Sequence, residues 1–272
     1  GWQTAVTSLT HTIPQTTAKY FRCVYNPGPP IGYDESMRLG SRQALPNGAD
    51  YLREIDPLGL ASILLSSTAT VHHLPGKNAS QWGRSRLITD SEIPSSACVP
   101  MDSIIDLSEK LNSDGTLKDW KPESGKWKVM RFGYVSQAKT TGGGLQCDRF
   151  NPEGVTAVYY GWYDAIQKHI PGGEEIINIL NIDSSEAGSQ NWSPIFRDEF
   201  RKRRGYDLMK YLPAMAGVMV GSGNITESFL LDARRTMIEL ITDNFYGQVQ
   251  KLAHENGTIV ASEAVCPTMI SD

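Results

Sequence analysis

The sequence predicts an α/β fold with parallel strands, and two observations carry this prediction. From residue 126 onward, segments typical of strands and helices follow one another in the order strand, helix, strand, helix, strand. Two of the strand segments are almost entirely apolar runs, which are typical of strands buried on both faces of a sheet. This order and this burial are those of α/β proteins with parallel sheets.

Two helices flank the first apolar run. Residues 152–170 place apolar side chains, among them Val158 and Trp162, at helical spacing, and a Pro-Gly-Gly sequence follows. Residues 194–204 have an acidic start and a basic end, which suits the helix dipole, and Gly205 stops the helix.

The longest helix is expected between Asn224 and Gly257. Asn224 and Glu227 have the spacing of a capping box, which opens a helix, and a glycine is typical of a helix end. The two apolar runs lie before and after this helical part of the chain, at residues 176–182 and 258–261. Both runs are predicted to be short, buried strands.

The first part of the chain has a different character. It is rich in Thr, Ser, Pro and Gly, and turn signals separate short β-like runs such as residues 61–71. Residues 126–135 alternate and are rich in β-forming residues, so a strand is expected there. We therefore expect a β- and loop-rich N-terminal segment at residues 1–125 and the α/β portion at residues 126–272.

Carboxylates follow both predicted parallel strands. Asp183 and Glu186 come after the first strand, and Glu263 comes after the second. In a parallel barrel the carboxyl ends of the strands form the active-site face, so one pocket is expected to hold these side chains. Paired carboxylates hydrolyse glycosides: one protonates the leaving oxygen, and the other activates water or attacks the anomeric carbon. Two alternatives remain open: Glu186 caps the next helix, or Glu263 binds a substrate hydroxyl or a metal ion.

Aromatic residues lie close to these carboxylates in the sequence. Trp192 follows Glu186 by six positions, and Trp162 and Tyr163 lie on the preceding helix. The apolar face of a sugar stacks on such rings, while its hydroxyls need hydrogen-bonding partners. We expect core packing for Trp162 and Tyr163, and substrate contact for Trp192.

Composition excludes several other classes of protein. Apolar residues make up 40% of the 272 residues and the net charge is −4, so neither global disorder nor a nucleic-acid or anionic-membrane partner is favoured. No apolar run is long enough to span a bilayer. The four cysteines lack zinc-type spacing, His72-His73 lacks a third ligand, and Gly142-Gly143-Gly144 lacks the rest of a nucleotide-binding motif.

Four N-x-S/T sequons occur, where chance gives roughly one or two. They begin at Asn78, Asn191, Asn224 and Asn256. The excess favours a secreted, extracellular or periplasmic location, and coincidence is the alternative.

Several motifs together resemble glycoside hydrolase family 106 over roughly residues 100–272. The central ones are Asp183-Ser184-Ser185-Glu186-Ala187-Gly188-Ser189-Gln190-Asn191-Trp192-Ser193-Pro194 and Arg203-Arg204-Gly205-Tyr206-Asp207. Further matches are Trp127-Lys128-Val129-Met130-Arg131-Phe132-Gly133-Tyr134, Gly144-Leu145-Gln146-Cys147-Asp148, Tyr211-Leu212-Pro213 and Phe229-Leu230 with Asp232, Arg234 and Thr236. The combination is specific, whereas no single piece is.

The resemblance implies an α-L-rhamnosidase that acts by inversion on polysaccharides or glycosides. It implies a (β/α)₈ TIM-like barrel, of which this chain would hold a part, with a β-rich N-terminal segment. It also implies a calcium ion near the sugar; no organic cofactor is expected. The implied general acid is Glu186, and Glu263 is the provisional partner carboxylate. Asp148, Asp183, Asn191 and Trp192 are the expected substrate-binding residues.

Two other readings stay open. One is a different exo-glycosidase on the same barrel, and the other is a fragment that binds carbohydrate without cleaving it. A complete barrel takes about 250 residues, and fewer follow the first predicted barrel strand, so a partial barrel is expected.

Overall fold

The computed structural model describes residues 13, 16–24, 62–72, 74–80, 93–135, 146–170, 177–182 and 190–262. The chain divides into two compact units, one of residues 13–67 and one of residues 1–12 with 68–272. The described residues of the first unit form no helix or strand. All of the elements below belong to the second unit.

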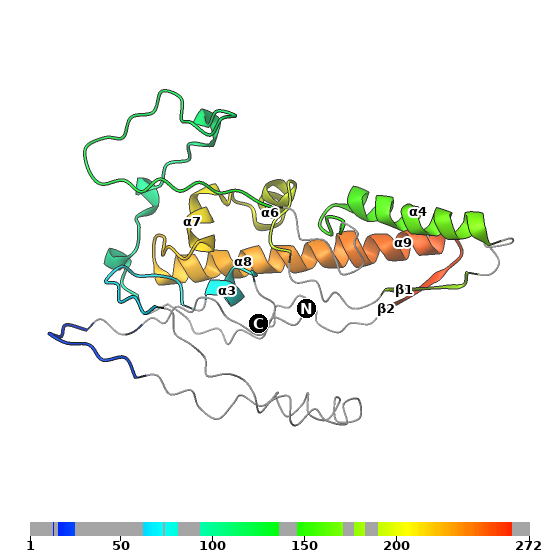
Figure 1. Cartoon of the computed structure of the whole chain (residues 1–272), viewed down its shortest axis with the longest axis horizontal. Coiled ribbons are helices and arrows are strands. Elements are labelled where there is room, and N and C mark those ends of the chain that lie inside the picture. The colour runs from blue at the N-terminus through cyan, green and yellow to red at the C-terminus, as the bar shows by residue number, and fades with distance from the viewer. Residues whose placement is uncertain are drawn as a thin grey trace. The chain divides into compact units, whose positions relative to one another are not determined.

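The second unit is mixed, with helices more abundant than strands among its described residues (Figure 1). The α-helices are α3 (Leu74–Lys77), α4 (Pro152–His169), α6 (Phe196–Arg204), α7 (Leu212–Met215), α8 (Gly223–Leu240) and α9 (Gln248–Glu255). The strands are β1 (Ile179–Ile182) and β2 (Ile259–Ser262). Short 3₁₀ turns are η1 (Ser95–Ala97), η2 (Met101–Ser103), η3 (Ser108–Lys110) and η4 (Met209–Tyr211), and η5 (Ile241–Gly247) is a π-helix.

One continuous helical rod is built from α8, η5 and α9, and it contacts α3, α4, α6, α7 and β2 (Figure 1). The rod confirms the long helix expected from the sequence. The capping residue is different, because the Ser222 hydroxyl accepts a hydrogen bond from the Ile225 N–H at 3.1 Å. Asn224, the predicted cap, lies inside the helix, and Glu227 pairs with Lys77 instead.

The first half of the rod carries the larger apolar core. Buried side chains of α8, including Phe229 and Leu230, face Phe200 of α6 and the irregular chain around Val71 and Val220. The Phe200 and Phe229 ring centroids are 5.9 Å apart. Irregular segments before α4 therefore contribute to the same core as the helices.

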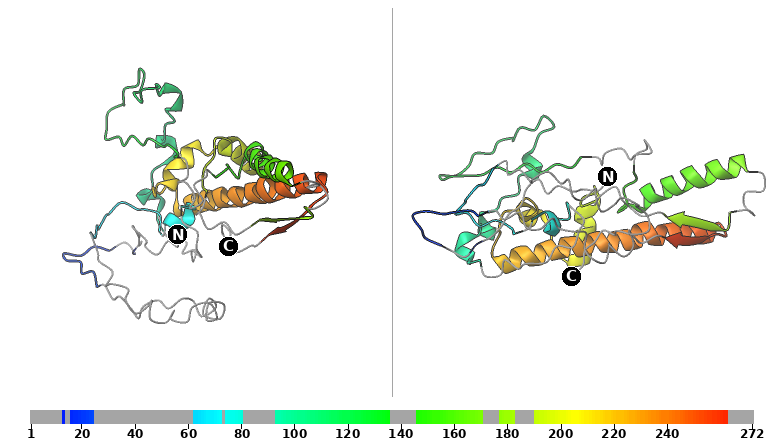
Figure 2. Two further views of the ribbon diagram at one scale, coloured as in Figure 1. Left: turned by 45° about the vertical axis from the view of Figure 1, so that its right-hand side comes forward. Right: turned by 60° about the horizontal axis from the view of Figure 1, so that its bottom comes forward.

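The second half of the rod packs against α4 and the two strands, and together they form a second apolar cluster. Val155, Tyr159 and Tyr163 of α4 are buried there with Val249 and Leu252 of α9. Helix α4 begins where the sequence predicted. Its buried face differs, because Val158 and Trp162 are 40% and 71% exposed. In both views of Figure 2 the strands lie next to α4 and α9 at the same end of the rod.

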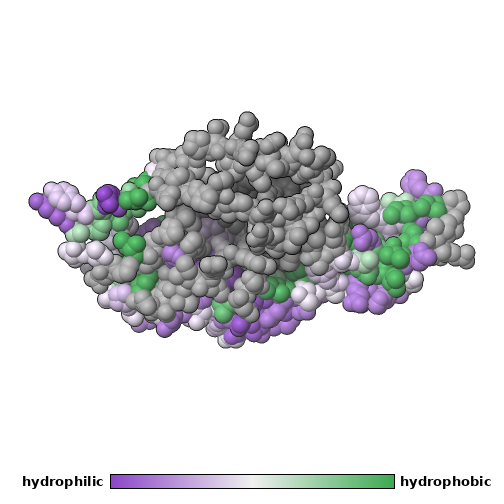
Figure 3. All heavy atoms as spheres, turned by 90° about the horizontal axis from the view of Figure 1, so that it is seen from below, coloured by the Kyte–Doolittle hydropathy of each residue, from purple (hydrophilic) through white to green (hydrophobic). Residues whose placement is uncertain are grey.

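Strands β1 and β2 pair in parallel, as predicted, but their predicted burial on both faces is wrong for the described chain. Side chains alternate between the faces of a sheet, and Leu180 and Val260 turn toward the helices. Ile179 and Ile259, which are register partners, turn away and are 57% and 58% exposed. Figure 3 shows apolar surface at the end of the molecule where these strands lie.

The described sheet has two strands, so the described residues form no closed barrel. A barrel needs a parallel sheet that closes on itself, and a two-stranded sheet cannot do so. The order of α4, β1, the rod and β2 is nevertheless the alternating order expected from the sequence.

The strand predicted at residues 126–135 is wrong, because none of these residues pairs with another segment of the described chain. A strand needs a partner for its backbone groups as well as β-forming side chains. The apolar residues of this stretch are exposed, with Val129 at 61% and Tyr134 at 65%. In residues 62–72, 74–80 and 93–135, strand-like pairing is limited to the bridges Thr70–Val218, Val99–Val220 and Leu111–Leu117.

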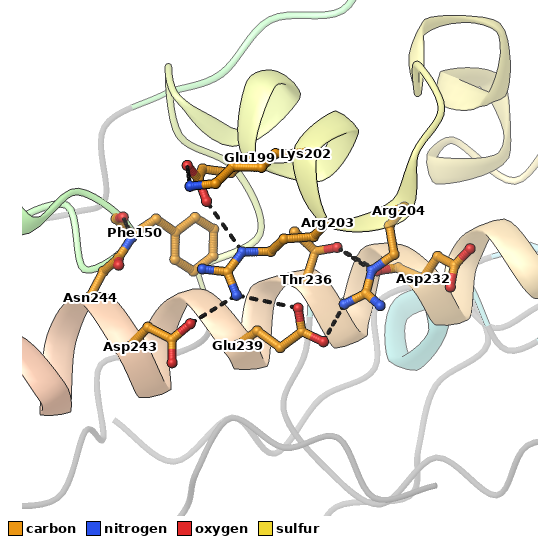
Figure 4. Close-up of polar contacts among 10 residues, drawn as sticks. All are labelled: Phe150, Glu199, Lys202, Arg203, Arg204, Asp232, Thr236, Glu239, Asp243 and Asn244. Atoms are coloured by element: carbon orange, nitrogen blue, oxygen red, sulfur yellow. Dashed lines mark hydrogen bonds and ion pairs between the residues drawn. The ribbon is translucent and has the colours of Figure 1, made fainter.

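A network of ion pairs ties α6 to the rod (Figure 4). The Arg203 guanidinium donates from Nε to Glu199 at 3.2 Å, and from one amino group to Glu239 at 3.3 Å and Asp243 at 2.9 Å. Arg204 donates to the Thr236 hydroxyl at 3.0 Å. These contacts fix α6 across the junction between α8 and η5.

The observed cap makes a stability prediction. Ser222→Ala removes the acceptor for the Ile225 N–H and should lower the free energy of unfolding by about 1 kcal/mol. Asn224→Ala is the matched control, because this exposed position lies inside α8 and should change stability by a few tenths of a kcal/mol, roughly neutral or favourable. Denaturant unfolding of both variants checks this, and a larger loss for Asn224→Ala would contradict it.

The ion-pair network makes a second prediction. Arg203→Lys should destabilise the protein by about 1–2 kcal/mol, because one ammonium cannot reach three carboxylates in the directions that a guanidinium does. Arg201→Lys is the same substitution at a half-exposed position whose partner, Asp207, also binds Arg197, and should cost less than about 0.5 kcal/mol. Equal losses in thermal unfolding would disprove the role of Arg203.

Candidate active site

The carboxyl ends of β1 and β2 lie at the same edge of the sheet. The strands are parallel, and Ile182 is the register partner of Ser262. Both are the last residues of their strands. In parallel α/β proteins, this edge is the one that carries the active site. The sequence continues from Ile182 to Asp183 and Glu186, and from Ser262 to Glu263, and these three carboxylates lie outside the described residues.

Asp148 is the centre of a hydrogen-bonded cluster beside the chain that follows β1. Its Oδ1 atom accepts from Gln190 Nε2 at 2.6 Å and from the Phe150 N–H at 3.0 Å. Its Oδ2 atom accepts from the Ser193 hydroxyl at 2.5 Å. Three donors to one carboxylate hold it in a fixed orientation. Whether it also contacts substrate, as expected from the sequence, stays a prediction.

Gln190 is the second member of this cluster, and its whole side-chain amide is used. The Oε1 atom accepts from the Arg149 N–H at 3.1 Å. The Nε2 atom donates to Asp148 and to the Trp192 carbonyl, the latter at 3.2 Å. Gln190 is therefore fixed to the segment that precedes α4.

The cluster rests on the apolar core and on the rod. Phe150 is fully buried, and its ring centroid lies 5.8 Å from that of Phe196. Its carbonyl accepts from Asn244 Nδ2 of η5 at 2.6 Å (Figure 4). Asn151 caps α4 by accepting from the Glu153 N–H at 3.0 Å. The segment before α4 is thus held by η5 of the rod and by the first turn of α4.

Charge near the cluster is partly shielded from water. Arg149 is 6% exposed, and burial lowers the pKa of its guanidinium, while the neighbouring Cys147 and Tyr246 act in the opposite direction. Burial also disfavours the charged form of Cys147, so it raises the pKa of this thiol, and the positive charge of Arg149 partly offsets that increase. Arginine stays protonated in proteins, so a buried positive charge lies beside the cluster.

The other predicted binding residues lie in the same segment. Asn191 donates from Nδ2 to the Asn78 carbonyl at 3.2 Å. The Trp192 ring packs on the larger core, with its centroid 5.3 Å from that of Phe196. The packing expected from the sequence is therefore wrong for the two tryptophans: Trp162, expected in the core, is exposed, and Trp192, not expected there, contacts the core. Substrate contact by Asn191 and Trp192 stays a prediction.

Sequence reasoning did not single out Gln190, Ser193 or Asn244. Gln190 and Ser193 belong to the motif that includes Glu186, but nothing in that motif indicates their partner, because Asp148 is more than forty positions away. Asn244 looks like an ordinary residue of a long helix. Its amide is important only because the Phe150 carbonyl is buried beside it.

The described residues offer no metal site. Within them, no group of three or more His, Cys, Asp or Glu side chains is arranged to hold a metal ion. The oxygens of Asp148 already accept three hydrogen bonds. Calcium thus finds no fit among the described residues. Among the described residues, none of the helices combines the length and the apolar composition that a membrane span needs.

Comparison with known proteins extends this picture. A model of the α-L-rhamnosidase family, glycoside hydrolase family 106, matches residues 8–270. A curated protein of Formosa agariphila, provisionally named a beta-glucuronidase, is 37% identical over 199 residues, which cover 70% of this chain and 17% of that protein. A solved rhamnosidase from Novosphingobium sp. PP1Y is 30% identical with a TM-score of 0.55, covering 74% of this chain and 20% of that one.

The mixed fold and these matches place the chain in a family of glycoside hydrolases. It belongs to the α-L-rhamnosidase family, glycoside hydrolase family 106. The match begins at residue 8, well before the region near residue 100 where the motifs begin. The chain spans about a fifth of the length of either relative.

The packing of the tryptophans makes a prediction. Trp192→Ala should destabilise the protein by roughly 2 kcal/mol, because it removes a partly buried ring that packs on Phe196. Trp162→Ala is the matched control, and with 71% of its side chain exposed it should cost less than about 0.5 kcal/mol. Denaturant unfolding measures both; a larger cost for Trp162→Ala would refute the packing.

Proposed function

We propose that the protein to which this chain belongs removes terminal α-L-rhamnose from polysaccharides or other glycosides by inverting hydrolysis. Family membership supports the chemistry, and the parallel register of β1 and β2 is the structural observation that carries it. Ile182 and Ser262 end the two strands side by side, and neighbouring strands lie about 4.8 Å apart. Carboxylates that follow both ends therefore start from one edge.

In this proposal Glu186 is the general acid. It protonates the glycosidic oxygen while the bond from that oxygen to the anomeric carbon breaks. A general acid must have a raised pKa to be protonated at the working pH, and burial or a neighbouring carboxylate acts in that direction. The sequence places Glu186 four positions after the last residue of β1 (186 − 182).

Glu263 is the proposed partner. It takes a proton from a water molecule that attacks the anomeric carbon from the opposite face, so the sugar leaves with inverted configuration. Inversion requires the two carboxyl groups about 6.5–9.5 Å apart, which leaves room for that water, whereas about 5–5.5 Å is the spacing for retention. The start of Glu263 directly after Ser262, at the neighbouring strand end, supports this pairing.

Sugar binding is assigned to residues around the same strand end. Trp192 offers an aromatic face, and Asn191 and Asp183 offer polar groups. Asp148 is joined through Gln190 to the Trp192 carbonyl. Calcium remains part of the proposal through the family resemblance alone. Among the described residues, no group of three or more His, Cys, Asp or Glu side chains is arranged to hold it.

Two wider features belong to the same proposal. One is that β1 and β2 are neighbouring strands of a (β/α)₈ barrel, which their parallel pairing and the cover of α4 and α9 support. The other is a secreted or periplasmic location, which a polysaccharide substrate supports, since such polymers lie outside the cytoplasm.

A second candidate is a glycosidase for another sugar, which the name of the Formosa agariphila relative favours. Glucuronides carry a carboxylate, so an enzyme for them gains from a positive charge at the sugar. A panel of aryl glycosides, with α-L-rhamnoside and β-D-glucuronide as the main pair, separates the two. Binding of sugar with no turnover on any of them would support a carbohydrate-binding role instead.

Glu186→Gln in the full-length gene product is the direct test of the acid. It should lower kcat on aryl rhamnosides with poor leaving groups by about 10²–10⁴-fold, because such groups need protonation. Substrates with activated leaving groups, such as dinitrophenol, should lose far less. Steady-state kinetics across a series of leaving groups checks this, and equal activity of variant and wild type on the poor leaving groups would sink the assignment.

A further inference from the structure

Described residues lie on both sides of the segment that includes Glu186. On one side lies β1, whose last residue Ile182 pairs with Ser262 of β2. On the other side lies Gln190, only four positions after Glu186 (190 − 186). A short segment with fixed ends has few conformations available, so what holds its ends limits where its side chains can lie.

The Gln190 anchor is built as a clamp. Its amide makes three hydrogen bonds: to the Asp148 carboxylate at 2.6 Å, from the Arg149 N–H at 3.1 Å and to the Trp192 carbonyl at 3.2 Å. The bond to Asp148 is charge-assisted, and bonds of this kind are about twice as strong as those between neutral groups. Ser193 holds the same carboxylate from the other side and is 3% exposed.

The clamp is connected to the rigid part of the fold. Phe150, next to Arg149, is fully buried and accepts a hydrogen bond from Asn244 of η5 at 2.6 Å (Figure 4). Asn191, next to Gln190, donates to the Asn78 carbonyl at 3.2 Å. Gln190 is thus joined, through its neighbours, to segments that contact the rod and the irregular chain before α4.

We propose that Gln190 and Asp148 are positioning residues, which hold the segment of the general acid in the orientation that protonates the leaving oxygen. The inference rests on the proposed function, in which Glu186 is that acid. A misplacement of about 1 Å can cost about 10²-fold in rate, so loss of the clamp should act on the protonation step. It should have little effect on substrates that need no protonation.

Gln190→Met in the full-length gene product is the main test, because methionine keeps the length of the side chain and removes every hydrogen bond. We expect kcat to fall about 10–100-fold on an aryl rhamnoside with a poor leaving group, such as phenol. On the dinitrophenyl substrate it should fall less than about 3-fold, with KM changed by less than about 3-fold. A loss of folded enzyme would instead lower the apparent kcat on both substrates by the same factor.

Asp148→Asn keeps the shape of the side chain and removes the charge, so kcat should again fall more on the poor leaving group than on the dinitrophenyl substrate, with a smaller difference. A change in KM shared by both substrates would report its proposed contact with the sugar and not the positioning role. Gln248→Ala is the matched control: this glutamine also joins two elements, α9 and α4, through Thr156 at 3.0 Å, and it does not touch the clamp. Its ratio of rates on the two substrates should equal that of the wild type.

Failure of the inference and failure of the proposed function give different results. If Glu186→Gln loses activity on poor leaving groups while Gln190→Met and Asp148→Asn keep the wild-type ratio, the positioning role is overturned and the acid assignment stands. If Glu186→Gln keeps the wild-type ratio, the acid assignment fails and the inference fails with it. A changed ratio in all three variants supports both.

Discussion

Buried backbone carbonyls need hydrogen-bond donors, and much of this structure depends on how that need is met. Irregular chain packs against the rod of α8, η5 and α9, where helix and sheet ladders cannot satisfy it. Side-chain amides and guanidinium groups supply the donors instead. The bonds run from Arg234 to Lys77, from Asn78 to Met215, from Asn191 to Asn78 and from Asn244 to Phe150.

The same constraint explains the surplus of sequons. The amides of Asn78, Asn191 and Asn256 each donate to a backbone carbonyl, the last to Leu252 at 2.8 Å. The hydroxyl residues two positions after three of the sequon asparagines are almost fully buried, namely Ser193, Thr226 and Thr258. These residues have a packing role that accounts for their presence, so their number no longer argues for secretion.

Sequence reasoning succeeded where the signal lies within one element. Gly205 ends α6 with a φ of 81°, and Gly257 follows α9 with a φ of 69°, as a left-handed cap requires. Reasoning failed where the outcome depends on a distant partner. Residues 126–135 have the composition of a strand, but no partner strand lies beside them in the described chain. Trp162 is on the same helix as the buried Tyr163, yet its side chain faces away from the core.

The candidate site divides in the same way. The carboxylates were predicted from the sequence because they follow apolar strands, and the parallel register of β1 and β2 agrees with that reasoning. Their catalytic role stays a prediction. Gln190 could not be predicted, because its role depends on a hydrogen bond to Asp148, and the two residues meet only in the folded chain. A general acid works only where its proton meets the leaving oxygen, so a carboxylate on a connecting segment needs support from outside that segment. The Asp148 carboxylate, held by three donors against a buried aromatic core, has the rigidity to give that support.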